Sequence, residues 1–137
     1  MDERDSIRIA KASFDRCSAT PEFLAGFYEN FFRACPDAKP LFAKTDFARQ
    51  TKALRDAIGL LLIAPFLSTE KDAPTLLARV AERHSRRHLN IEPRFYPPFI
   101  ESLIETLKSF DAEYSPEVEA AWRAAIAKGV AYMQAHY

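Results

Sequence analysis

Apolar residues recur every three or four positions along most of the chain, a spacing that places them on one face of an α-helix. In the first segment Ile7, Ala10, Phe14 and Cys17 follow this period. The chain has only three glycines and few runs of β-branched residues, whereas residues that favour helix, such as Ala, Leu, Glu, Lys and Arg, are frequent. The pattern therefore predicts an all-α protein.

Prolines and capping residues divide this pattern into separate helices. The chain has nine prolines, and a proline is tolerated in the first turn of a helix but not in its interior. The predicted helices run from Asp5 or Ser6 to about Ser18, from Pro21 behind a Thr20 cap, from a Thr45 or Asp46 cap to near Pro65, from about Ala73 to about Arg87, from about Pro93 to Phe110, and from Pro116 behind a Ser115 cap almost to Tyr137. Residues 35–42 contain two prolines and predict only a short, tight turn of helix. Six or seven helices with short connections and no internal repeat predict a single domain over residues 1–137.

Composition and charge narrow the classes of function. Hydrophobic residues make up 48% of the chain and charged residues 28%, the balance of a folded domain rather than of a disordered segment. Lysine and arginine together number 19, as do aspartate and glutamate, so the net charge is zero and no nucleic-acid partner is expected. The longest apolar run, residues 58–67, is too short to cross a bilayer, and the charged N-terminus lacks a signal-peptide core. We therefore expect a cytoplasmic protein with no membrane partner.

Three polar residues, one on each of three predicted helices, continue apolar stripes. They are Tyr28, Gln50 and His84. Each has an ordinary explanation: a tyrosine whose hydroxyl reaches the surface, an amide at the core margin, or a neutral core histidine with one hydrogen bond. A buried hydroxyl or amide left unpaired costs about 1–3 kcal/mol. Together the three residues therefore favour a polar ligand that lies between their helices.

Two histidines four residues apart, His84 and His88, also raise the possibility of a zinc pair. Such a pair needs a stable helical face and further ligands. Pro93 follows closely, so His88 is predicted where the helix is ending. Glu82 and Glu92 are not on the face of the two histidines, which disfavours zinc.

Several stretches, in this order, give the chain a resemblance to a known family. They are "FYENFF", "CPDAKPLF", Gln50 with Leu54 four residues later, His84, "NIEPRFYPPFIESLI" and the late "AAW". Over essentially its whole length the chain resembles bacterial single-domain globins and the globin domains of flavohaemoglobins. The resemblance implies an all-α globin fold, with six to eight helices packed as a sandwich around a haem pocket, and haem b as the cofactor.

The resemblance also implies roles for individual residues. His84 falls at the position of the iron ligand, and Tyr28 and Gln50 fall on the distal side, where the gas ligand binds. His88 resembles the histidine that lies beside a haem propionate. The remaining residues expected to contact haem are Phe42, Leu54, Ile91, Tyr96, Phe99 and Leu103. The competing assignment, with His88 as the iron ligand, leaves too little helix before the next proline.

The proximal side departs from the flavohaemoglobin pattern. In that family a late glutamate joins a tyrosine in polarising the iron ligand; Tyr96 corresponds to the tyrosine, but "KGVAYMQAHY" contains no glutamate. The pair Pro97-Pro98 is also expected to shift Tyr96. The Nδ1–H group of His84 is expected to bond to a backbone carbonyl of its own helix or to the hydroxyl of Ser85. Because the chain ends at Tyr137, no flavin or nicotinamide domain is expected to follow.

Several functions fit these residues. The first is reversible binding of O2, and of NO and CO, with Tyr28 and Gln50 donating hydrogen bonds to the ligand. The second is enzymatic, the oxidation of NO to nitrate, which would require an external reductase as partner. The third is gas or redox sensing through a partner protein, and a haem-free helical regulator is a fourth. A monomer or a homodimer formed through the last two helices, the G and H helices of globins, is compatible with all of them.

Overall fold

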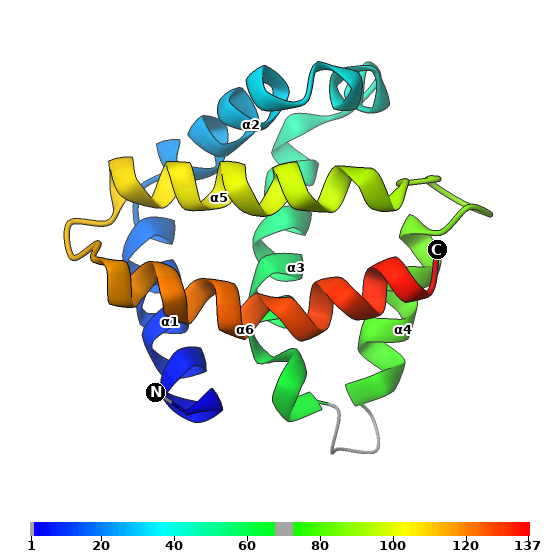
Figure 1. The fold of residues 1–137 in the computed structure, drawn as a ribbon. Coiled ribbons are helices and arrows are strands. Elements are labelled where there is room, and N and C mark those ends of the chain that lie inside the picture. Colours follow the sequence, from blue (N-terminus) through cyan, green and yellow to red (C-terminus); the bar gives the residue numbers. More distant parts are fainter. Residues whose placement is uncertain (1, 68–72) are drawn as a thin grey trace.

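The computed structural model describes residues 2–67 and 73–137, which form six α-helices and two short 3-10 helices (Figure 1). Within these ranges there is no β-strand. The elements are α1 (Glu3–Ser18), α2 (Glu22–Ala34), η1 (Pro36–Phe42), α3 (Phe47–Leu67), α4 (Ala73–His84), η2 (Pro93–Phe95), α5 (Tyr96–Phe110) and α6 (Pro116–Ala135). The predicted all-α class is confirmed, as is the short turn of helix at residues 35–42, which is η1.

Side-chain caps begin three of the helices. Ser115 accepts a hydrogen bond from the amide of Val118 at the start of α6, as predicted. Of the two candidates before α3 it is Asp46 that caps, because its carboxylate accepts from the amides of Ala48 and Arg49. Asp2 caps α1, so that helix begins earlier than predicted. A carboxylate at this position satisfies backbone donors that have no partner within the helix.

Three other predicted boundaries are wrong. The helix α2 begins at Glu22 with Pro21 at the cap position, so Thr20 is one residue too early; its carbonyl instead accepts from the amide of Phe23 in a turn. The helix α3 continues past Pro65 to Leu67, since a proline in the last turn removes only one backbone hydrogen bond. The helix α4 ends at His84 rather than near Arg87.

The helices pack in crossed layers. In Figure 1, α5 and α6 lie across the front, while α1, α3 and α4 pass behind them. Trp122 of α6 is fully buried and packs edge-on against Phe14 of α1, with ring centroids 5.9 Å apart. Where α6 crosses α3, a Cβ atom on Gly129 would lie only 3.2 Å from the carbonyl oxygen of Leu61 and 3.3 Å from Cβ of Ala64. The glycine therefore permits the close approach of these two helices.

None of the helices in the described ranges is both long and apolar enough to cross a membrane.

A buried carboxylate joins the first helix to the end of α5. Asp111 accepts hydrogen bonds from the hydroxyl of Ser13 (2.5 Å), from Nε and Nη2 of Arg16 (2.9 and 3.0 Å) and from the amide of Glu113 (2.9 Å). Burial opposes ionisation of this carboxyl, but the bonds from Arg16, Ser13 and Glu113 outweigh it and hold the pKa of Asp111 below its ordinary value. The buried charge is thus fully paired.

Replacing Asp111 by asparagine should lower the free energy of unfolding by about 1.5–3 kcal/mol at neutral pH, because charge-assisted hydrogen bonds are lost. The folded pKa lies below the unfolded value of about 3.9, so the carboxylate stabilises the fold above that pH. The stabilisation is lost as the pH falls through the folded pKa. Urea unfolding at neutral and acidic pH measures this difference. Asp15→Asn, an exposed substitution on α1, is the control. A difference that stayed constant into strong acid would contradict the assignment.

Candidate functional site

The imidazole of His84 is held by its own helix. His84 is the last residue of α4 and is partly buried, and its Nδ1 lies 2.8 Å from the carbonyl oxygen of Val80. A carbonyl can only accept, so Nδ1 carries the proton and Nε2 keeps its lone pair. Burial lowers the pKa of His84, opposed by the Val80 carbonyl and assisted by the charge of Arg83. The ring is therefore neutral at neutral pH, with Nε2 available as a metal ligand.

This contact decides between the two predicted partners of Nδ1. The hydroxyl of Ser85 donates instead to the carbonyl of Glu82, at 2.6 Å. The acceptor for His84 is therefore the backbone carbonyl of Val80, which bears no net charge.

The segment after His84 folds back and caps α4. The amide of Ile91 donates to the carbonyl of His84 (2.9 Å), and that of Leu89 donates to the carbonyl of Arg83 (3.0 Å). Asn90 adopts a left-handed conformation with φ of 53°, and its amide donates to the carbonyl of Ser85 (2.8 Å). These bonds satisfy carbonyls that a helix end leaves without partners. They explain why α4 stops at His84, and they place Ile91 next to it.

His88 does not share the apolar face of His84. Its side chain is exposed, and its Nε2 lies 3.2 Å from a carboxylate oxygen of Glu82. The residues that the structure describes contain no group of three or more histidine, cysteine or acidic side chains able to hold a metal ion. The assigned place of His88 beside a haem propionate stays a prediction.

Tyr28 is a buried hydroxyl without a hydrogen-bond partner. The residue is 6% exposed, and its Oη finds no partner among the described residues. Burial raises the pKa of Tyr28 to about 12, while the side chain of Gln50 acts in the opposite direction. The side chain of Gln50 is thus close enough to interact with the phenol, although no hydrogen bond of ordinary geometry joins the two groups. Ser18, Ser102 and Trp122 also have a buried polar atom without a described partner, so the unpaired state alone does not mark a ligand site. Tyr28 differs from them because a second polar side chain, that of Gln50, interacts with its hydroxyl.

Four phenylalanine rings surround Tyr28, and the nearest along the chain is that of Phe27, with centroids 5.5 Å apart. The centroid of its ring lies 5.8 Å from that of Phe32 on α2, 5.7 Å from that of Phe42 in η1 and 5.4 Å from that of Phe47 at the start of α3. The same three side chains line part of a hollow of about 450 Å³. Sequence analysis did not single out Phe47. The Asp46 cap could have indicated it, because Phe47 then begins α3 three residues before Gln50, on the same side of the helix.

The other predicted haem contacts belong to the apolar core that contains Tyr28. Tyr96 and Leu103 of α5 are buried in it, and burial raises the pKa of Tyr96 to about 12. Phe99 packs edge-on against Phe27, with centroids 5.2 Å apart. The partly buried members of this group are Phe42, Leu54, Ile91 and Phe99.

These residues together fit a haem group. His84 offers one free ring nitrogen, and Tyr28 offers an unpaired donor on a different helix. The core that contains Tyr28 adds apolar side chains, and a flat porphyrin ring requires such contacts. His84, Phe42 and Leu54 could hold the cofactor, while Tyr28 and Gln50 could bond to a small polar molecule beside it.

Comparison with known proteins assigns the family. A family model described as Globin matches residues 25–133, most of the chain. The structure also resembles protein PA3967 from Pseudomonas aeruginosa PAO1, which is described as structurally highly homologous to a human hemoglobin. The two are 27% identical, and the match has a TM-score of 0.87 and covers 96% of this chain and 98% of that one. The predicted resemblance is thereby confirmed, and the chain belongs to the globin family.

Proposed function

We propose that this globin binds haem b and, through it, binds diatomic gases reversibly, with O2 as the principal ligand. The observation that carries the proposal is the hydrogen bond from Nδ1 of His84 to the carbonyl of Val80, which leaves Nε2 as the free nitrogen. Haem iron held by a single histidine supplies a vacant position for a gas molecule. The family and the structural likeness to PA3967 support the same conclusion.

The proximal partner favours binding over bond cleavage. A carboxylate that accepts from a ligating histidine makes the imidazole more basic and donates more charge to the metal. Val80 offers a neutral carbonyl, and Ser85 is engaged elsewhere. The chain thus supports an iron ligand of ordinary basicity, suited to holding O2 rather than activating it.

The distal residues favour a polar ligand. The hydroxyl of Tyr28 has lost its water and has no described protein partner, a cost of about 1–3 kcal/mol. A gas molecule that accepts a hydrogen bond would remove that cost, and Gln50 of α3, whose side chain interacts with this hydroxyl, would offer a second donor. Bound O2 accepts such bonds well and CO poorly, so Tyr28 and Gln50 should discriminate between them.

The histidine assignment is tested by two substitutions. His84→Ala should abolish the normal ferrous–CO spectrum after haemin is added, because the only well-placed ligand is gone. His88→Ala should keep that spectrum and change haem affinity by no more than about tenfold, as expected for an exposed side chain. Haemin titration and optical spectra of the two variants measure this. If the spectrum were lost in His88→Ala alone, the assignment of His84 as the iron ligand would be wrong.

The function itself is tested by Tyr28→Phe. Losing a hydrogen bond of about 1.5–3 kcal/mol to a partly charged acceptor should speed O2 release by roughly 10- to 100-fold. Release of CO should change little. Stopped-flow measurements of both gases check the prediction, and Gln50→Leu should shift O2 release in the same direction. An O2 release rate within about twofold of the parent would mean that the hydroxyl does not reach the ligand.

The same substitution should have the opposite effect on the haem-free chain. There Tyr28→Phe removes an uncompensated buried hydroxyl, so the free energy of unfolding should rise by about 1 kcal/mol. Tyr114→Phe is the matched control: its hydroxyl donates to Glu119, so this substitution should not stabilise. Urea unfolding of the haem-free variants measures both. If Tyr28→Phe destabilised the haem-free chain, the hydroxyl would have a protein partner after all.

A further inference from the structure

Positive charge is concentrated beside the proposed iron ligand. The chain as a whole is neutral, yet residues 79–94 contain five arginines and two glutamates, a net charge of +3. The segment contains no lysine. It includes the second half of α4, which carries His84, and the turn that caps that helix.

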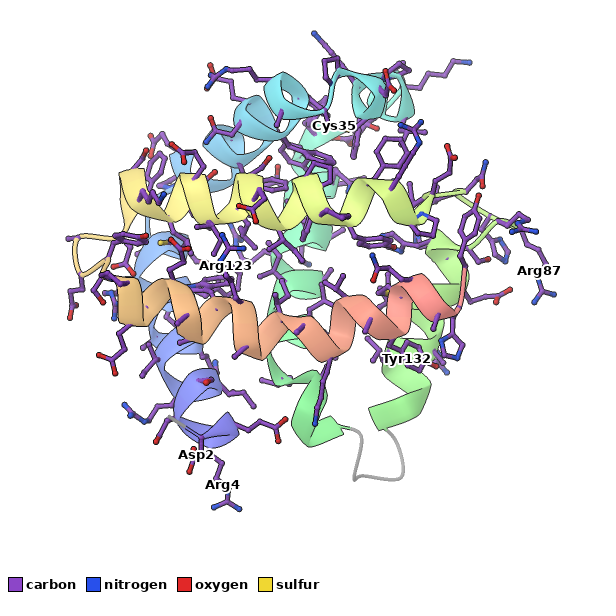
Figure 2. The ribbon with its side chains drawn as sticks, viewed as in Figure 1. Asp2, Arg4, Cys35, Arg87, Arg123 and Tyr132 are labelled. Carbon is purple, nitrogen blue, oxygen red and sulfur yellow. The ribbon has the colours of Figure 1, made fainter. Side chains whose placement is uncertain are left out.

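Most of these arginines are exposed and have no close acidic partner among the described residues. Arg79, Arg83 and Arg86 form no ion pair with any residue that the structure describes. Arg87 lies 3.8 Å from Glu82, but its side chain is 81% exposed, so the pair contributes little. Figure 2 shows Arg87 extending outward from the edge of the molecule. Two of the arginines have closer contacts: the guanidinium of Arg86 lies over the ring of Tyr137, 4.9 Å from its centroid. Arg94 pairs with Asp37 at 3.2 Å and with Glu92 at 3.4 Å.

An exposed leucine lies among these arginines. Leu89 is 49% exposed, the highest value among the exposed large hydrophobic side chains of the described residues. Its amide bonds to the carbonyl of Arg83, so the leucine lies beside the end of α4. Nearby, Arg79, Arg83, His88, Ala78 and one acidic residue, Glu82, line a shallow hollow of about 550 Å³. An exposed apolar residue close to several arginines has the composition typical of a protein–protein interface.

We infer that Arg79, Arg83, Arg86, Arg87 and Leu89 form a docking surface, the arginine patch, for a partner protein. The docking face of that partner would carry aspartate and glutamate side chains around an apolar residue. The patch adjoins His84, so a protein bound there would lie against the helix that holds the proposed iron ligand. The inference goes beyond gas binding and does not require haem to be present.

The form of the patch favours a protein over other anions. The charges are spread along α4 and the turn after it, whereas a site for a small anion needs donors that converge on one point. All of them are guanidinium groups, which pair with carboxylates in a two-pronged geometry and are enriched at protein interfaces, where lysine is depleted. A single exposed leucine is also a small apolar area for attachment to a membrane surface.

The charge component is tested with a glutamate-rich peptide carrying interspersed leucines, immobilised as a model of the acidic face. Arg79→Glu/Arg83→Glu should weaken binding of the full chain at least about tenfold, and the affinity of the parent should fall as salt is raised. Arg4→Glu/Arg8→Glu is the matched control: both residues are exposed, have the same spacing on α1, and give the same change in net charge. In Figure 2, Arg4 lies far across the molecule from Arg87. Circular dichroism verifies that both variants are folded.

The apolar component is tested by Leu89→Ala. This substitution should abolish the preference for the leucine-containing peptide over one with alanine at the same positions. Leu41→Ala, which removes another exposed leucine (44% exposed), should preserve that preference.

Three results would overturn the inference. The first is an equal loss of binding in the two arginine double variants. It would mean that the peptide responds to the net charge of the chain and not to the arginine patch. The second is loss of peptide binding when haemin is added, which would assign the arginines to the haem propionates. The third is binding to anionic phosphatidylglycerol vesicles without binding to the peptide, which would indicate a membrane surface. Each outcome leaves the gas-binding proposal unaffected, because that proposal is tested by the spectra of His84→Ala and by O2 release from Tyr28→Phe.

Discussion

The hydrogen bond between Nδ1 of His84 and the carbonyl of Val80 determines what the site can do. It selects the tautomer, leaves Nε2 free, and makes the second partner of the ring a neutral group. The bond spans one helical turn back from His84, the last residue of α4, and the segment after His84 folds back onto the last carbonyls of the helix. One more turn of helix would place His88 on the same helical face as His84. In the observed turn the side chain of His88 instead contacts the carboxylate of Glu82. The helix end thus separates the proposed ligand from its neighbour.

Two buried polar groups of this protein differ in whether their hydrogen bonds are satisfied by other residues. Asp111 is buried with four hydrogen bonds, three of which come from Ser13 and Arg16 and connect α1 to the end of α5. Tyr28 is equally buried, and its hydroxyl has no partner among the described residues. A satisfied buried charge stabilises one conformation, whereas an unsatisfied donor costs free energy until a ligand arrives. The phenylalanine rings around Tyr28 strengthen this effect, since they keep the hydroxyl from water.

The charged side chains are distributed unevenly over the helices. The segment that carries His84 is basic in a chain with no net charge, so the field near the site is positive although the total is zero. Helices α5 and α6 instead pair charges with each other: Arg123 of α6 bonds to Glu101 of α5, and also to Glu119 of its own helix. The paired charges join two helices, while the unpaired arginines of α4 remain available for an outside partner.

The sequence by itself determined the helical class, the cap at Ser115, a cap at either Thr45 or Asp46, and the three polar residues that interrupt apolar faces. These features are local, because periodicity and capping depend on residues only a few positions apart. The resemblance to globins added the expected roles of His84 as iron ligand and of Tyr28 and Gln50 on the distal side. The net charge of zero gave no indication of the basic segment at residues 79–94, because a net charge carries no information about position.

Only the tertiary structure decided the end of α4, the partner of Nδ1, the separation of His88 from His84, and the enclosure of Tyr28 by Phe47. Each depends on how a turn folds back or on which rings meet from different helices. Such contacts join residues whose spacing along the chain has no fixed period, so a hydrophobic pattern cannot contain them. The unpaired state of the Tyr28 hydroxyl is of the same kind, since it is defined by all the helices packed around it.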